Sequence, residues 1–249
     1  MSRAIALIPA RYASSRFPGK LLADRTGKPL IEHVIERVRH SRHVGRIIVA
    51  TDDQRIAAVV QACGARAEMT RGDHPNGTAR IAEVAARLDA DEVDLIVNVQ
   101  GDEPEIEPSV IDEMVEGLRA DPDAPMATLA GEFEADEDPT DPNIVKLVLN
   151  QRGRAMYFSR SLIPFDRDGR GSVPLKHPGL YAYRREFLLQ YVRLAPTPLE
   201  QFEQLEQLRA LEHGYPIAVI RTRIRHHGID TPEQYEAFVQ RVLNGRSAD

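Results

Sequence analysis

The chain has 249 residues, 42% of them hydrophobic and 28% charged, and its formal net charge at pH 7 is −6. This length suits a single large α/β domain with a sizeable buried core. The single cysteine excludes an internal disulfide framework, no apolar run approaches the ~20 residues that a membrane span needs, and the acidic balance disfavours a nucleic-acid-coating protein. We therefore expect neither a membrane nor a nucleic-acid partner.

Strand and helix patterns alternate through the first hundred residues. Short apolar runs at 4–8, 46–51 and 94–100 predict strands, and "ARAEMT" (65–70) is a candidate for a further short strand. Helical spacing at 29–38, 54–63 and 78–88 predicts the helices between them. We expect Asp52 to cap the second of these helices and Gly64 to end it. The alternation predicts a doubly wound, Rossmann-like α/β sheet that is mixed but mostly parallel.

The second half of the chain has a different pattern. Apolar runs at 124–133, 143–150 and 216–222 predict strands, a continuous helix is expected over 199–214, and the last helix is expected in "TPEQYEAFVQRVL". No repeat or flexible linker divides the sequence. We therefore predict one domain over 1–249, with an insertion at roughly 124–198.

Three cations follow the first strand in "IALIPARYASSRFPGK" (5–20), at Arg11, Arg16 and Lys20. Ligands of α/β folds bind at the carboxyl ends of strands, and Gly19 allows the backbone to approach a phosphate closely. The stretch matches neither a Walker loop nor a G-x-G-x-x-G turn. It predicts a triphosphate-binding loop, and the alternative is a solvated surface loop.

Acidic residues end the buried run in "IVNVQGDEP" (96–104), where Asp102 and Glu103 follow Gln100. Carboxylates at the end of a central strand are well placed to hold Mg²⁺ together with phosphate oxygens. The alternative is a turn that caps the helix after Pro108.

Two further stretches have a ligand interpretation and a capping interpretation. In "HHGIDTPEQYEAF", Thr231 and Gln234 form a capping-box pattern, and Asp230 either aids that cap or faces Asp102 as a second metal-binding carboxylate. In "HPNGTAR", the backbone at Gly77 either contacts a nucleobase or phosphate, or belongs to a plain helix N-cap.

Taken together, the motifs resemble those of the 3-deoxy-manno-octulosonate (Kdo) cytidylyltransferases, also called CMP-Kdo synthetases. The matching stretches are "IPARYASSRFPGKLL", "RIIVATDD", "NVQGDEP", "DPNIVKLVLN", "YFSRSLIPFDRD", "GLYAYRREFL", "LEQLRALEHG" and "GIDTPEQYE", in family order over nearly the whole chain. The resemblance implies a nucleotidyltransferase fold, the reaction CTP + Kdo → CMP-Kdo + diphosphate, a Mg²⁺ cofactor and a cytoplasmic homodimer, with the insertion contributing to the sugar site and the dimer interface.

The resemblance also implies a role for individual residues. Catalytic roles fall on Lys20, Asp102 and Asp230, of which the two aspartates are the metal ligands. The nucleotide-binding positions are Ala10, Arg11, Arg16, Lys20, Gly77, Arg80 and Gln100. The sugar-binding positions are Arg160, His177, Tyr181, Glu206 and Gln207.

The sequence departs from the family pattern at three places. Ala79 stands where the family has an acidic residue before Arg80, Pro178 removes a backbone donor after His177, and the loop from Asp166 to His177 is short. Within the same chemistry, the alternative acceptor is another acidic sugar such as 8-amino-Kdo. Outside it, the alternatives are a nicotinamide-dependent oxidoreductase, which the missing glycine fingerprint disfavours, and a non-enzymatic sugar-nucleotide-binding protein.

Overall fold

A computed structural model of the chain describes residues 3–13, 16–223 and 228–246. Its strands are β1 (Ala4–Ala10), β2 (Val44–Thr51), β3 (Arg66–Met69), β4 (Leu95–Asn98), β5 (Met126–Glu132), β6 (Lys146–Leu149), β7 (Ala155–Ser159), β8 (Leu175–Lys176), β9 (Tyr181–Arg184) and β10 (Ile217–Arg221). Its helices are α1 (Leu30–Arg39), α2 (Gln54–Ala62), α3 (Gly77–Ala86), α4 (Pro108–Ala120), α5 (Arg185–Tyr191), α6 (Pro198–Glu203), α7 (Leu208–Glu212) and α8 (Pro232–Arg246), with a 3₁₀ turn η1 (Lys20–Leu22).

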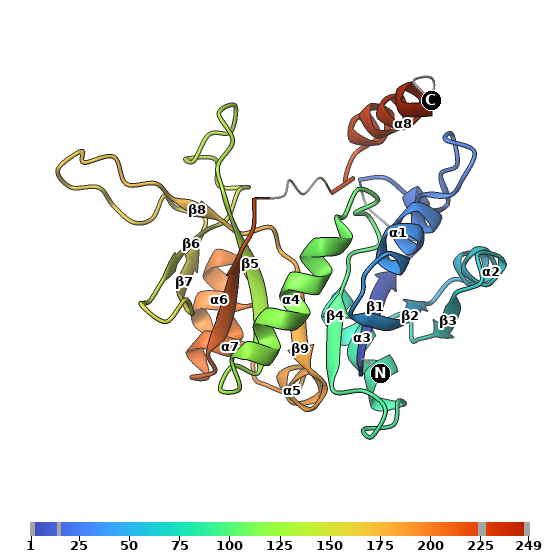
Figure 1. Cartoon of the computed structure of the whole chain (residues 1–249), viewed down its shortest axis with the longest axis horizontal. Coiled ribbons are helices and arrows are strands. Elements are labelled where there is room, and N and C mark those ends of the chain that lie inside the picture. Colours follow the sequence, from blue (N-terminus) through green and yellow to red (C-terminus); the bar gives the residue numbers. More distant parts are fainter. Residues whose placement is uncertain (1–2, 14–15, 224–227, 247–249) are drawn as a thin grey trace.

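The described strands form one mixed sheet in the order β3-β2-β1-β4-β9-β5-β8-β6-β7, with β10 paired to β5. The first four of these strands are parallel to one another, and β9 then pairs antiparallel with both β4 and β5 (Figure 1). The predicted mixed α/β fold with a parallel core is therefore confirmed. The second half of the chain adds the antiparallel strands at the other side of the sheet.

Helices cover both faces of the sheet, as a doubly wound fold requires. Along β1, Ala4, Ala6 and Ile8 pack into one core with α1, α2, α4 and α8, whereas Ile5 and Leu7 pack into a second core with α3, α5 and α7. Because successive strand side chains point to opposite faces, β1 is buried on both sides. This burial explains why its sequence is a continuous apolar run.

The helix expected over 199–214 is divided in two, and that prediction is wrong in this respect. Helix α6 ends at Glu203, Gln204 takes a left-handed conformation with φ 53°, and α7 begins at Leu208. The carboxylate of Glu203 accepts hydrogen bonds from the Ser159 hydroxyl and the Arg160 backbone N–H. These contacts to a distant strand overcome the helical propensity of the segment.

The cap of α2 also differs from the prediction. Asp53, rather than Asp52, accepts hydrogen bonds from the backbone N–H groups of Arg55 and Ile56. The Asp52 side chain is consequently available for a different partner, described below.

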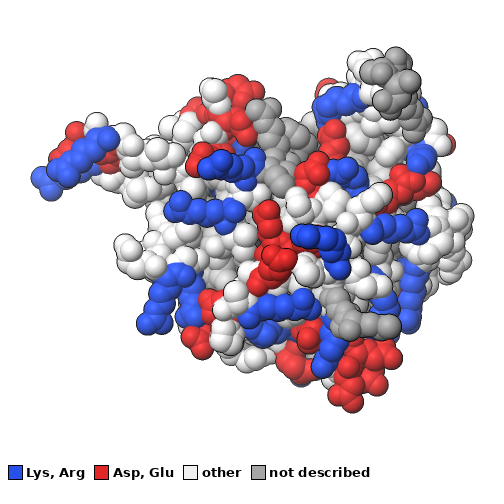
Figure 2. Space-filling view, viewed as in Figure 1, with Lys and Arg blue, Asp and Glu red and all other residues white. Residues whose placement is uncertain are grey.

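No helix in the described ranges is long and apolar enough to cross a membrane. On the face shown in Figure 2, Lys and Arg side chains are interspersed with Asp and Glu. A long loop between β7 and β8 projects from the body of the molecule at the left of Figure 1.

Candidate active site

The loop after β1 returns to the carboxyl end of the sheet through a left-handed glycine. Gly19 has φ 72°, and its N–H donates to the Tyr12 carbonyl oxygen at 3.1 Å. A Cβ at this position would lie 3.1 Å from the Tyr12 ring, so the turn favours glycine for both reasons. Lys20 follows at once, and its side chain is only 11% exposed.

Asp102 follows β4, the strand next to β1. Gly101 brings this loop against the first strand, since a Cβ there would lie 3.0 Å from the Pro9 carbonyl oxygen. Asp102 does not cap α4, whose N-cap residue is Glu107. The capping alternative for Asp102 is therefore wrong, and its carboxylate faces the first loop.

Asp230 reaches the same place because α8 packs on the first loop and on α1. The Tyr235 ring lies 5.6 Å from the Phe17 ring, and the Ile229 N–H donates to the Asp102 carbonyl oxygen at 2.9 Å. The cap of α8 is made by Thr231 and Gln234, as the capping box predicts. The side chain of Asp230 therefore does more than aid the cap.

Lys20 joins the two aspartates. Its Nζ donates to Asp102 Oδ2 at 2.5 Å, to the Ile229 carbonyl oxygen at 2.7 Å and to Asp230 Oδ1 at 3.4 Å. Arg16 adds an ion pair to Asp230 at 2.9 Å. Residues separated by 82 and 210 positions from Lys20 thus converge on one ammonium group.

A cavity of about 290 Å³ opens beside this cluster, and we call it the arginine cavity. Each nucleotide-binding position implied by the resemblance lines it, and so do both aspartates: Ala10, Arg11, Arg16, Lys20, Gly77, Arg80, Gln100, Asp102 and Asp230. The structure therefore brings together every residue predicted for this part of the site.

The carboxylate partner of Arg80 is Asp52, directly after β2, rather than a residue at the neighbouring position. Arg80 is buried, and its guanidinium donates to Asp52 Oδ2 at 2.9 Å and to Thr70 Oγ1 at 2.6 Å. Asp52 thus supplies the negative charge that Ala79 lacks. The orientation of Arg80 is fixed in spite of this departure from the family pattern.

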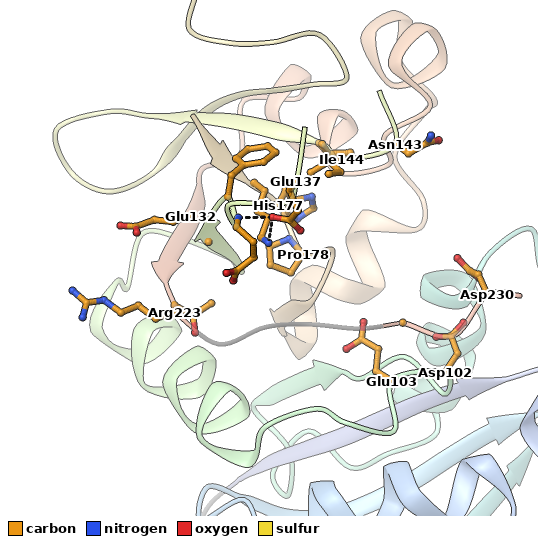
Figure 3. A pocket seen from close by; sticks show the side chains of 17 residues that line it. Asp102, Glu103, Glu132, Glu137, Asn143, Ile144, His177, Pro178, Arg223 and Asp230 are labelled. Carbon is orange, nitrogen blue, oxygen red and sulfur yellow. Dashed lines mark hydrogen bonds and ion pairs between the residues drawn. The ribbon is translucent and has the colours of Figure 1, made fainter. Parts of the chain in front are cut away.

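A second cavity, of about 530 Å³, shares Asp102 and Asp230 with the first, and we call it the His177 cavity. Figure 3 shows Asp102, Glu103 and Asp230 at one side of it and His177, Pro178 and Glu137 at the other. The two aspartates therefore stand where two binding spaces meet. Such a junction is suited to a reaction between two ligands.

Glu103 also lines the His177 cavity. Burial raises the pKa of its carboxyl to about 8, and the adjacent Asp102 carboxylate adds to the effect. At neutral pH Glu103 is consequently protonated for most of the time, which limits the negative charge beside Asp102.

His177 is neutral, and its hydrogen bonds fix its tautomer. Burial lowers the pKa of the imidazole to about 3. The hydroxyl proton of Thr128 is donated to the Leu180 carbonyl oxygen, so Thr128 Oγ1 accepts from His177 Nε2 at 2.8 Å. Nδ1 then accepts from Gln207 Nε2 at 3.4 Å. The proton of His177 is therefore on Nε2.

The other predicted sugar-binding residues lie outside the described lining of the His177 cavity. Arg160 donates to the carbonyl oxygens of Glu203 and Pro142, and Tyr181 is buried beside the His177 ring. Gln207 touches the cavity only through His177. Glu206 turns to a different part of the molecule, the N-terminal turn of α3.

Several lining residues were not singled out from the sequence, although they stand in the stretches that carry the family resemblance or beside predicted residues. Lys176 is adjacent to His177 and pairs with Glu137 at 2.5 Å. His74 and Asn76 precede Gly77 in the wall of the arginine cavity. Their positions next to predicted residues were the available signal.

Oxygen donors suitable for a divalent cation converge at the junction. Within the described residues, no group of three His, Cys, Asp or Glu side chains forms a metal cluster. The Asp102 and Asp230 carboxylates and the Ile229 carbonyl oxygen nevertheless surround the positive charge of Lys20 Nζ. Mg²⁺ binds one or two carboxylates and completes its shell with water and phosphate oxygens, so this donor set fits that ion.

Comparison with known proteins is consistent with this geometry. A family model described as cytidylyltransferase matches residues 5–224. A 3-deoxy-manno-octulosonate cytidylyltransferase of Syntrophobacter fumaroxidans is 52% identical over 239 residues, which cover 95% of this chain and 96% of that protein. The chain belongs to the 3-deoxy-manno-octulosonate cytidylyltransferase family. The family enzyme of Geobacter metallireducens is 50% identical, with 95% and 96% of the two chains covered.

Solved structures agree with the family assignment. A CMP:2-keto-3-deoxy-manno-octonic acid synthetase complexed with CTP has a TM-score of 0.92 and 44% identity, and the match covers 98% of this chain and 100% of that one. A 4-diphosphocytidyl-2C-methyl-D-erythritol synthase, at TM-score 0.65 and 15% identity over 98% and 99% of the chains, shares the fold. The fold of this chain is therefore also found in a structure of much lower sequence identity.

Proposed function

We propose that this chain transfers the cytidylyl group of CTP to 3-deoxy-D-manno-octulosonate and releases diphosphate. The observation that carries the proposal is the junction of two cavities at Asp102 and Asp230, bridged by Lys20. A two-substrate transfer needs both ligands against one cluster of charge. The names of the relatives supply the two ligands, and the cationic wall of the arginine cavity suits a triphosphate.

In this proposal CTP occupies the arginine cavity and the acidic sugar occupies the His177 cavity. The sugar hydroxyl oxygen at C2 forms a bond to the α-phosphorus, the bond from that phosphorus to the bridging oxygen breaks, and the hydroxyl proton is lost to water. Arg11 and Arg16 are exposed and able to follow the departing diphosphate, while buried Lys20 is held in place. These cations neutralise the charge that develops on the leaving group.

We also propose that Asp102 and Asp230 hold Mg²⁺. When bound, the ion neutralises phosphate charge and lowers the pKa of the attacking hydroxyl. In its absence Lys20 balances the two carboxylates, and the protonated Glu103 adds no further charge at neutral pH. The cytoplasm as the location of the reaction rests on the family resemblance alone.

A homodimer is the proposed assembly, with part of the contact coming from the segment 124–198. The β7–β8 loop carries Phe165, which is 86% exposed, and Val173, which is 74% exposed. Large apolar side chains this exposed on one projecting loop are suited to a contact surface. Phe165→Ser is expected to shift the protein toward monomer in analytical ultracentrifugation. An unchanged dimer, or a wild-type monomer at micromolar concentration, would contradict this arrangement.

The function is tested by measuring diphosphate release from the purified protein with each of four nucleoside triphosphates and with Kdo, 8-amino-Kdo or sialic acid as acceptor. We expect turnover with CTP and Kdo in the presence of Mg²⁺. Faster turnover with 8-amino-Kdo would change the acceptor but keep the chemistry. No diphosphate release with any pair would refute the assignment.

A further inference from the structure

The break between α6 and α7 directs one carboxylate to a distant helix. After the left-handed Gln204, the side chain of Glu206 reaches the first turn of α3. Its Oε1 accepts from Thr78 Oγ1 at 2.8 Å, and its Oε2 accepts from Asn76 Nδ2 at 3.1 Å. These contacts join segments 128 and 130 residues apart in the sequence.

Asn76 is held from two sides as a result. Its Oδ1 accepts from the Ala79 N–H at 2.8 Å and caps α3, while its Nδ2 is used on Glu206. Asn76 and Gly77 line the arginine cavity, and a Cβ at Gly77 would lie 3.0 Å from the Pro9 ring. The position of this wall, packed against the end of β1, therefore depends on the contact with Glu206.

The surroundings of Glu206 make the contact rigid. The rings of Tyr181, Tyr183 and Tyr191 follow one another in tilted pairs with 6.0 Å between centroids, and the Tyr191 hydroxyl donates to the Glu206 carbonyl oxygen at 2.5 Å. Burial raises the pKa of the Glu206 carboxyl, and its hydrogen bond from Thr78 works in the opposite direction. A buried polar group without a hydrogen-bond partner is destabilising, so the Glu206 carboxylate and its donors, Asn76 and Thr78, stabilise one another.

The neighbouring residue serves the other cavity. Gln207 donates toward His177, whereas Glu206 does not belong to the described lining of the His177 cavity. Adjacent residues at the start of α7 thus act on different walls. The family resemblance alone assigns both of them to the sugar.

We propose that Glu206 is a positioning residue for the nucleotide, which acts by fixing the Asn76–Gly77 wall of the arginine cavity. The inference rests on the proposed function, because it assumes that CTP occupies that cavity. It predicts that loss of the Glu206–Asn76 hydrogen bond weakens CTP binding and leaves sugar recognition nearly unchanged.

The test uses Glu206→Gln, which keeps the shape but removes the charge and one of the two acceptor oxygens that Asn76 and Thr78 use. By calorimetry with CTP, excess Mg²⁺ and no acceptor, we expect the Kd for CTP to rise by roughly tenfold, as the loss of one charged hydrogen bond allows. The KM for Kdo should stay within about twofold. The control is Glu212→Gln, an equal charge change at an exposed residue of α7, and it should leave both constants unchanged.

A donor–acceptor exchange provides the sharper readout. Asn76→Asp alone places two carboxylates together and should also weaken CTP binding. Combined with Glu206→Gln, the introduced amide donates to the introduced carboxylate, which still caps α3, so the double variant should bind CTP more tightly than either single variant. If Glu206 acts by a route other than its hydrogen bond with Asn76, no such rescue is expected.

Two results would overturn the inference: an unchanged Kd for CTP with a raised KM for Kdo, or a double variant no better than the singles. If Glu206→Gln fails to fold, Asn76→Ser keeps a capping oxygen but is too short to reach Glu206, and it carries the same prediction for CTP. Wild-type protein that neither binds CTP nor releases diphosphate would instead refute the proposed function.

Discussion

Replacement of Lys20 by methionine removes the ammonium and keeps most of the side-chain volume. In the structure this ammonium makes hydrogen bonds to both aspartates and to the Ile229 carbonyl oxygen, and the side chain is 11% exposed. Hydrogen bonds to charged groups contribute about 1.5–3 kcal/mol each. If Lys20 makes two of these to the departing diphosphate, their loss corresponds to about 3–6 kcal/mol, or roughly a 10²- to 10⁴-fold fall in kcat/KM.

The fold should tolerate Lys20→Met far better than the reaction does. The Asp102 and Asp230 side chains are 28% and 44% exposed, so water screens much of the repulsion between them. We expect Tm to fall by less than about 5 °C for a chain of this size. Lys28→Met is the matched control, because Lys28 pairs with Glu36 outside both cavities.

The assay is steady-state diphosphate release with CTP and Kdo as substrates. Lys20→Met with kcat/KM within about threefold of wild type would refute the account of the first loop. A comparable loss in Lys28→Met would show that the effect comes from charge in general rather than from the Lys20 position.

Three further predictions concern the walls of the site. Because the pKa of His177 is lowered from 6.5 to about 3, the stability that comes from the neutral imidazole is full above pH 6.5 and is lost as the pH falls. Between pH 6.5 and 5, urea titrations should show the unfolding free energy of wild type dropping by ~2 kcal/mol relative to that of His177→Asn. A difference between the two proteins that stays constant with pH would contradict this prediction. Asp52→Asn leaves the buried Arg80 guanidinium without its carboxylate, so calorimetry should show weaker CTP binding, whereas unchanged binding would mean that Arg80 is oriented by other groups. Gly101→Ala places a methyl group 3.0 Å from the Pro9 carbonyl oxygen and should cost about 1–3 kcal/mol of unfolding free energy, which a wild-type Tm would disprove.

The sequence was most informative where one local rule decides the structure. The strand at 4–8 is an apolar run because both of its faces are covered, and the cap at Thr231 follows from the spacing to Gln234. The first loop was recognised by its cations, and its carboxyl-end position follows from the parallel sheet. These features depend on residues close to one another in the chain.

Contacts between distant segments could not be predicted in the same way. The segment 199–214 has a helical pattern throughout, and only the contacts of Glu203 with β7 and of Glu206 with α3 explain its division. A contact between distant segments also explains why Asp53, rather than Asp52, caps α2: the Asp52 side chain pairs with Arg80 of α3. Helix propensity and capping rules do not indicate which residue from a distant segment will contact these side chains.

The central claim is that Asp102 and Asp230 act on one bound cation at the junction of two cavities. It is tested most directly by the dependence of kcat on Mg²⁺ concentration in Asp102→Asn, Asp230→Asn and the double variant. We expect each single variant to lose roughly 10²-fold or more, as the loss of a charge-stabilising group does, and the double variant to lose little beyond the worse single, because both remove the same site. Near-normal turnover in either single variant, or losses that multiply in the double variant, would contradict the claim.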